Sequence, residues 1–180
     1  MILLYRGISP LSRTIRFRTR VISWLPPSCD YSHVAWELDD ASVIEAWKKG
    51  GVRHVPTFAA DHTPGTSVDV FEVRCPRPHL RTNIELFLLS QVGKRYDTAG
   101  ILGFVARQDN MQRKDRWFCS ELIASAFSRS KMPLLARLEP HRMLPGMIVL
   151  SPFLERVETR ICRSRIQPEP VGSLLTPCTP

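Results

Sequence analysis

The sequence predicts an α+β fold in which an antiparallel sheet or small barrel packs against helices. Three observations carry this prediction. The first half of the chain alternates apolar and polar residues in short runs separated by Gly, Pro and Asp turns, a pattern typical of strands. From Pro78 the apolar residues recur at helical spacing, and an apolar run at 148–151 predicts a late strand. Strands that precede helices, instead of alternating with them, favour α+β over a doubly wound sheet.

The strand-like segments of the first half share a short length and an extended pattern: they are residues 1–5, 15–22, 32–38, 42–47, 52–55 and 67–74. The first of them is predicted to be an edge strand. Asp39-Asp40-Ala41 separates two of these segments and predicts the turn of a hairpin. The N-terminal half is therefore expected to supply most of the sheet.

Three helices are expected in the second half of the chain. The first begins at Pro78 and ends at Gly93, because proline is favoured at a helix start and glycine at its end. Tyr96-Asp97-Thr98 predicts the cap of a second, short helix that runs to Val105. The third begins near Cys119, and its apolar face consists of Leu122, Ile123, Ala126 and Phe127.

Length and composition predict one globular domain over residues 1–165, followed by a flexible Pro/Ser/Thr-rich tail over 166–180. The chain is 43% hydrophobic and 23% charged, which are ordinary globular values. It has no apolar run of 18 residues, so no integral membrane segment is expected. The apolar start is too short for a signal peptide. The sequence thus predicts a protein that is cytoplasmic as synthesised.

The cysteines and histidines do not predict a metal site or a disulfide framework. The five cysteines, at 29, 75, 119, 162 and 178, contain no C-x-x-C pair. The five histidines are scattered without the spacing of a helical ligand pair. Reduced thiols and no metal or other cofactor are therefore expected.

The formal charge is +8, and the densest basic run lacks any acid: it consists of Arg6, Arg13, Arg16, Arg18 and Arg20. Such a run could bind nucleic acid, anionic lipid or another anionic polymer such as that of a cell wall. The simpler interpretation, which we favour, is a solvated arginine-rich face. No helix-turn-helix, zinc-finger or RNP-type motif accompanies the charge.

Cys119 and His33 are the strongest candidates for catalytic residues. Cys119 lies where an aromatic segment runs into a helix, and a helix N-terminus lowers the pKa of a thiol. An imidazole nearby can then form the thiolate–imidazolium pair that attacks acyl carbons. The simpler alternatives are a buried core cysteine and a hydrogen-bonded strand histidine.

Glu45 is the candidate third member, and its position depends on the hairpin register. If Asp39-Asp40-Ala41 forms a three-residue loop, Ala35 faces Glu45, and Glu45 lies diagonal to His33. A two-residue loop would place Glu45 on the opposite face of the hairpin. A carboxylate beside His33 could fix the ring tautomer and stabilise the imidazolium. His54 is an alternative third member.

Four short motifs stand in a telling order: Tyr31-Ser32-His33-Val34, then Val43-Ile44-Glu45-Ala46 with Gly51-Val52, then Lys94-Arg95-Tyr96-Asp97, then Phe118-Cys119-Ser120-Glu121-Leu122. With the histidine before the cysteine, this order resembles the circularly permuted branch of the NlpC/P60 papain-like superfamily, and in particular the YiiX/YaeF-like group. The resemblance covers roughly residues 1–152. It implies a permuted papain-like fold.

The resemblance also implies roles for four residues. Cys119 would be the nucleophile, His33 the base and later the acid, and Glu45 the residue that orients the imidazole. Tyr96 matches a recurrent tyrosine of the group and would lie near the oxyanion; a Tyr-Asp helix cap is the alternative interpretation. Lecithin:retinol acyltransferase-like relatives typically carry a histidine third member and an Asn-Cys-Glu motif, where this chain has Glu45 and Phe-Cys-Ser-Glu.

The activity that follows from the resemblance is that of a cysteine peptidase or amidase, which cleaves an amide through a thioester. Its implied substrates are cell-wall peptides, in a bacterial or phage setting. A lipid or N-acyl amino acid esterase or acyltransferase of the same fold is the alternative, and it would have an apolar tunnel beside Cys119. A non-catalytic basic binding module is the alternative from a different functional class.

Overall fold

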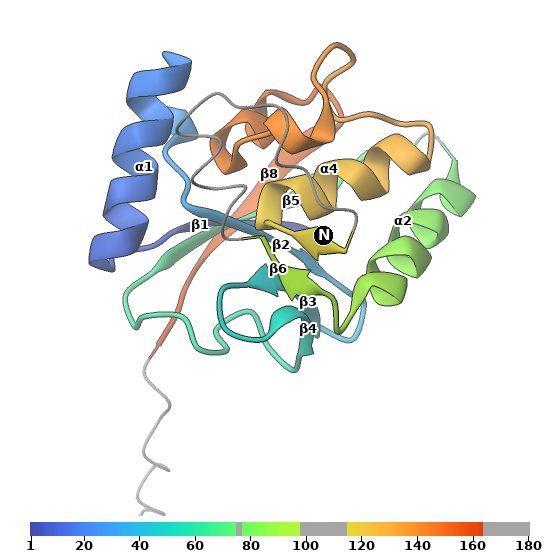
Figure 1. Ribbon diagram of the computed structural model, residues 1–180, viewed down its shortest axis with the longest axis horizontal. Coiled ribbons are helices and arrows are strands. Elements are labelled where there is room, and N and C mark those ends of the chain that lie inside the picture. The colour runs from blue at the N-terminus through green and yellow to red at the C-terminus, as the bar shows by residue number, and fades with distance from the viewer. Residues whose placement is uncertain (75–76, 98–114, 164–180) are drawn as a thin grey trace, which may run out of the picture.

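The computed structural model describes residues 1–74, 77–97 and 115–163. Its centre is a six-stranded antiparallel sheet (Figure 1). In spatial order the strands are β4 (Gly51–Val55), β3 (Val43–Trp47), β2 (His33–Glu37), β1 (Ile2–Arg6), β5 (Ser67–Val73) and β8 (Leu154–Ile161). A second, parallel pair joins β6 (Arg95–Tyr96) to β7 (Arg116–Trp117). The predicted α+β class with an antiparallel sheet is confirmed.

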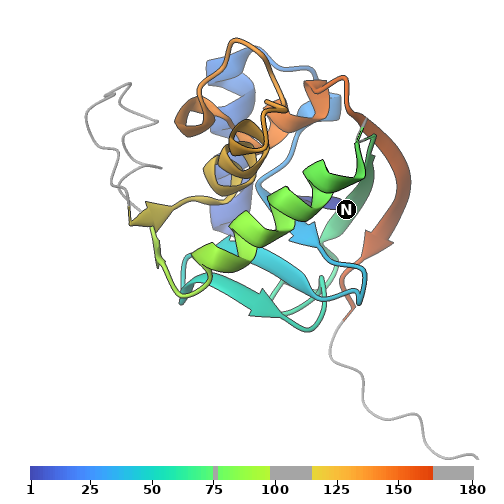
Figure 2. The ribbon, with the colours of Figure 1, turned by 90° about the vertical axis from the view of Figure 1, so that its right-hand side faces the viewer.

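Two helices cover one face of this sheet. These are α2 (Pro78–Gln91) and α4 (Cys119–Arg129), which pack against each other while α4 also contacts β2 and β3. They lie side by side in Figures 1 and 2. Helix α1 (Pro10–Ser23) stands apart from them, at the left of Figure 1. Three 3₁₀ turns complete the described helical elements: η1 (Pro27–Cys29), η3 (Pro140–Arg142) and η4 (Pro145–Leu150).

Strand β1 is central and not at an edge, because it pairs with β2 on one side and β5 on the other. Its side chains contribute to two cores. Ile2 and Leu4 pack with the α4 residues in one cluster, whereas Leu3 and Tyr5 belong to a second cluster with Val68 and other residues. A nearly continuous apolar run is what a strand buried on both faces requires. The prediction of an edge strand over residues 1–5 was therefore wrong.

The hairpin of β2 and β3 has the register that places Glu45 near His33. Trp36 pairs with Ile44, and Glu37 with Val43. The same register sets Ala35 opposite Glu45 across a three-residue loop. Ala41 closes that loop with a positive φ of 62°. The register expected from Asp39-Asp40-Ala41 is confirmed.

Two predicted strands are helical instead. Residues 15–22 belong to α1, which Ser9 caps by accepting a hydrogen bond from the Ser12 amide, and Pro10 occupies the first turn. Residues 148–150 belong to η4, which begins at Pro145. The late strand of the sheet is β8. The predicted helix over 98–105 and the predicted tail over 166–180 lie outside the described residues.

Candidate active site

Cys119 is the first residue of α4, and a short parallel ribbon positions it. Strand β7 ends at Trp117, two residues before the thiol, and Tyr96 of β6 pairs with that tryptophan. The ribbon is itself tied to the main sheet, because the Val52 amide donates to the Lys94 carbonyl at 2.8 Å. The start of α4 is therefore fixed relative to β4 by backbone hydrogen bonds.

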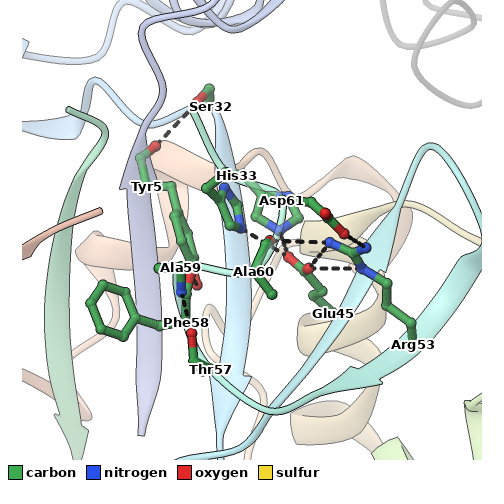
Figure 3. Close-up of polar contacts among 11 residues, drawn as sticks. Tyr5, Ser32, His33, Glu45, Arg53, Thr57, Phe58, Ala59, Ala60 and Asp61 are labelled. Carbon is green, nitrogen blue, oxygen red and sulfur yellow. Dashed lines mark hydrogen bonds and ion pairs between the residues drawn. The ribbon is translucent and has the colours of Figure 1, made fainter. Parts of the chain in front are cut away.

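His33 and Glu45 meet in the interior, as the hairpin register requires. The His33 Nε2–H donates to Glu45 Oε2 at 2.6 Å (Figure 3). Only 9% of His33 and 1% of Glu45 is exposed. A carboxylate this deeply buried favours the ionised form only when cations and hydrogen-bond donors surround it.

The thiol of Cys119 contacts the same imidazole. Burial lowers the pKa of His33, but the charge of Cys119 and a side-chain hydrogen bond to it raise that pKa, as do the hydrogen bond and charge of Glu45. The net result is a pKa raised from 6.5 to about 10. Since Nε2 is engaged by Glu45, Nδ1 is the nitrogen that remains for the sulfur. The structure thus brings together the three residues Cys119, His33 and Glu45.

Arg53 of β4 provides the second positive partner of Glu45. Its Nε and Nη2 donate to Glu45 Oε1 at 3.0 and 2.6 Å, and its Nη1 donates to Asp61 at 2.6 Å (Figure 3). Burial alone would raise the pKa of Glu45, yet the hydrogen bonds from His33 and His62 and their charges lower it well below its usual range. The carboxylate is therefore ionised at neutral pH.

His62 is the residue that the sequence did not single out. Its Nε2–H donates to Glu45 Oε2 at 3.3 Å, and its ring stacks on Tyr5 with centroids 4.1 Å apart. Burial lowers the pKa of His62, and the charges of His33 and Arg53 act in the same direction. His62 follows Asp61, which has a positive φ of 59°. It lies in a loop without periodicity, so only its residue type could have marked it.

His54 does not take the third position. It lies in β4 opposite Ile44, one residue from the site, and its Nε2 contacts the Ser42 hydroxyl at 2.7 Å. Neighbouring residues of a strand point to opposite faces. His54 therefore faces away from Glu45, and the alternative that placed it beside His33 was wrong.

The ligand atoms of His33, Glu45 and His62 lie within 4.8 Å of one another, so the described residues include one set that could hold a metal ion. The chain folds two scattered histidines onto one carboxylate, which their spacing did not suggest. However, the Arg53 guanidinium lies 2.6 Å from the same carboxylate. A fixed positive charge there opposes a cation.

A hollow of about 560 Å³ opens beside His33. Its wall is mixed: one part is apolar and includes Leu11, Ile15 and Trp47, and another is cationic and includes Lys48 and Lys49. Tyr96 also lines it. Burial raises the pKa of Tyr96, and the charge of Cys119 raises it further. Tyr96 is thus a neutral hydroxyl in the wall of the hollow, and its candidate role near the oxyanion stays a prediction.

Some arginines of the basic run pair with residues of the fold, and others are exposed to solvent. Arg6 donates to Asp69 at 2.6 Å and to Tyr31, and Arg16 pairs with Asp30, so these two arginines serve the fold. Arg13 and Arg20 are exposed. The side chain of Arg18 lies outside the described part of the structure. The five arginines therefore do not form one shared face.

Comparisons with known proteins add no relative: no protein-family model matches the chain, and no curated protein matches it significantly. In the described ranges, every helix is too short or too polar to cross a bilayer.

Proposed function

We propose that this protein is a cysteine hydrolase of the permuted NlpC/P60 papain-like kind, which cleaves an amide bond through a thioester intermediate. The observation that carries the proposal is the buried relay from the Cys119 thiol through His33 to Glu45. In this relay three residues that are far apart in sequence lie together: a thiol, an imidazole beside it, and a carboxylate that orients the imidazole, as nucleophilic catalysis requires. The chain order, with the histidine strand before the cysteine helix, supports the permuted assignment.

The relay supplies both halves of an acyl transfer. The Cys119 thiolate forms a C–S bond to the carbonyl carbon, and the C–N bond breaks as the His33 imidazolium gives its Nδ1 proton to the leaving amine. His33, now neutral, takes a proton from water, which attacks the thioester and releases the acid and the thiol. Glu45 accepts from Nε2–H throughout, so it holds the ring and stabilises its charged form.

The tetrahedral intermediate needs hydrogen-bond donors for its oxyanion. The backbone N–H of Cys119 at the start of α4 is one candidate donor, because amide groups there point out of the helix. The Tyr96 hydroxyl is a second candidate, since Tyr96 lines the hollow and its pKa responds to the charge of Cys119.

The experiment that tests the proposal compares Cys119→Ala with Cys162→Ala. Both thiols are buried, and Cys162 belongs to the opposite core cluster. Hydrolysis of muropeptide amides, measured by release of free amine, should be lost in Cys119→Ala and kept in Cys162→Ala. Iodoacetamide should modify Cys119 faster than the other cysteines. Full hydrolysis by Cys119→Ala would overturn the assignment, and alkylation no faster than that of the other cysteines would favour a non-catalytic module.

A second candidate function uses the same relay on an acyl ester or N-acyl amino acid. The observation that favours it is the mixed hollow, where Leu11 and Ile15 could contact an acyl chain while Lys48 and Lys49 attract an anionic group. Turnover of a series of p-nitrophenyl esters of increasing chain length distinguishes the esterase from the amidase. Turnover that rises with chain length and exceeds that on peptide amides would favour the esterase.

A further inference from the structure

Helix α1 and the residue that caps its C-terminus carry an exposed stripe of two cations and two aromatic rings. Arg13, Phe17 and Arg20 follow one another at spacings of four and three residues, which places them on one side of α1, and Trp24 is the residue that caps the C-terminus of the helix. All four are exposed; Phe17 is 69% and Trp24 is 92% accessible. Exposed aromatic rings that lie together with cations are candidates for an interaction surface.

The cations of this stripe have no internal role. Within the described part of the chain, neither Arg13 nor Arg20 forms an ion pair, whereas Arg16 on the inward side pairs with Asp30. The helix itself contains no acidic residue. Its outward face thus offers unneutralised positive charge on a protein whose formal charge is +8.

Trp24 ends the helix in a strained conformation. It has a φ of 51°, the left-handed region in which glycine or asparagine is the favoured cap. A bulky residue there is a genuine outlier, and such strain persists where it serves a function. The chain keeps a tryptophan at a position where a smaller residue would cost less, and it exposes that ring to solvent.

We propose that the stripe of Arg13, Phe17, Arg20 and Trp24 docks α1 on the surface of an anionic lipid bilayer. Exposed arginines attract anionic headgroups, and tryptophan and phenylalanine insert at the level of the headgroups. The combination fits a bilayer better than nucleic acid, because two exposed rings accompany the cations on α1 and at its C-terminus, and no nucleic-acid motif accompanies them. The opposite side of α1 lines the hollow through Leu11 and Ile15, so docking through the stripe would leave α1 between the bilayer and the candidate site. Bilayer binding itself does not depend on catalysis.

The test is co-sedimentation of the full chain with vesicles of phosphatidylcholine alone or mixed with phosphatidylglycerol. Wild type should bind the mixed vesicles and not the neutral ones, with a blue shift of tryptophan fluorescence. Arg13→Gln/Arg20→Gln should weaken binding roughly thirtyfold, because each basic residue near an anionic surface contributes on the order of fivefold. Trp24→Asn should weaken it roughly tenfold and remove most of the blue shift, while its melting temperature stays equal or rises because asparagine tolerates the cap.

Arg77→Gln/Arg137→Gln is the matched control, since it removes the same charge from exposed positions outside α1. Binding that survives this control and fails in the α1 variants supports docking through the stripe. Equal losses in both pairs would overturn the proposal, because net charge alone would then explain binding. The proposal would also be overturned if the wild-type protein failed to bind mixed vesicles, or if it bound duplex DNA through Arg13 and Arg20 instead.

Discussion

Glu45→Gln is the substitution that separates a working relay from a merely buried ion cluster. The glutamine keeps the shape of the side chain but removes its charge and turns one acceptor oxygen into an NH₂ donor. Arg53 can still donate to the remaining carbonyl oxygen. The new NH₂ group then faces the Nε2–H donors of His33 and His62, which held the carboxylate at 2.6 and 3.3 Å. His33 must give up its Nε2 proton or lose its partner.

The expected magnitude follows from these contacts. Removal of one member of a buried ion cluster costs on the order of 3 to 5 kcal/mol of unfolding free energy, and the 1% exposure of Glu45 places it in that class. Without the carboxylate charge, the pKa of His33 falls, so less imidazolium remains to stabilise the thiolate. Each unit by which the pKa of His33 falls lowers the fraction of the thiolate–imidazolium pair about tenfold at fixed pH. Turnover should fall by roughly 10³-fold or more, as for a lost orienting carboxylate.

The pH dependence has a definite sign. The pKa of folded Glu45 lies well below its usual value of 4.5, so its stabilising contribution is fully present above pH 4.5 and is lost as the pH falls through the lowered pKa. Wild type should therefore lose stability on acidification between pH 5 and 3. That part of the acid sensitivity should be missing in Glu45→Gln, whose unfolding free energy should change less over the same range.

Glu37→Gln is the matched control, and urea unfolding with site-resolved alkylation by mass spectrometry is the assay. Glu37 is also buried, at 2% exposure, and pairs with Arg160 instead of with the relay. Both variants should be destabilised, but only Glu45→Gln should slow the alkylation of Cys119, by at least about tenfold. Equal alkylation rates in the two variants would refute the coupling between carboxylate and thiol.

Three further outcomes are expected. His62→Phe keeps the stacking on Tyr5 but removes a donor to Glu45, so turnover should fall roughly tenfold while the melting temperature changes little; wild-type turnover would assign His62 to packing alone. Asp69→Asn should lower the unfolding free energy by about 3 kcal/mol, because Asp69 is buried with Arg6, yet leave Cys119 alkylation unchanged. Gly51→Ala should slow that alkylation and destabilise the fold, since its Cβ would lie 2.0 Å from the Lys94 carbonyl oxygen; Gly50→Ala, with open space around its Cβ, should do neither to the same degree.

The hairpin could be predicted because its information is local. A three-residue turn and a period of two determine which side chains share a face, and the structure has that register. Helix α1 was missed because one local pattern was misleading. Its residues 15–18 alternate apolar and basic types as a strand does, although Ser9 and Pro10 carried a helix-start signal that outweighs the alternation. The local cap was the better predictor there.

The contacts around the carboxylate could not be predicted in the same way. Arg53 reaches Glu45 because the two residues pair across β3 and β4, a register that depends on the turn at Gly50 and Gly51. His62 arrives from a loop whose course is set by its packing on Tyr5. The His62 contact depends on tertiary packing, which a single sequence read in short windows does not contain, whereas the Arg53 contact depends on the register of a second hairpin.

The position of the thiol follows from how the two cores meet at the start of β2. Cys119 belongs to the core cluster on the side of α4, together with Val34, whereas Ala35, two residues from His33 and on the same face, belongs to the other cluster. Sulfur and imidazole therefore approach from different faces of the sheet and meet where the strand begins. Nothing in the strand pairing of β2 fixes that approach. The ribbon of β6 and β7 does, because it connects β4 by backbone hydrogen bonds to the residue two positions before Cys119. Reactivity of the thiol should accordingly depend on this ribbon as much as on the side chains of the relay.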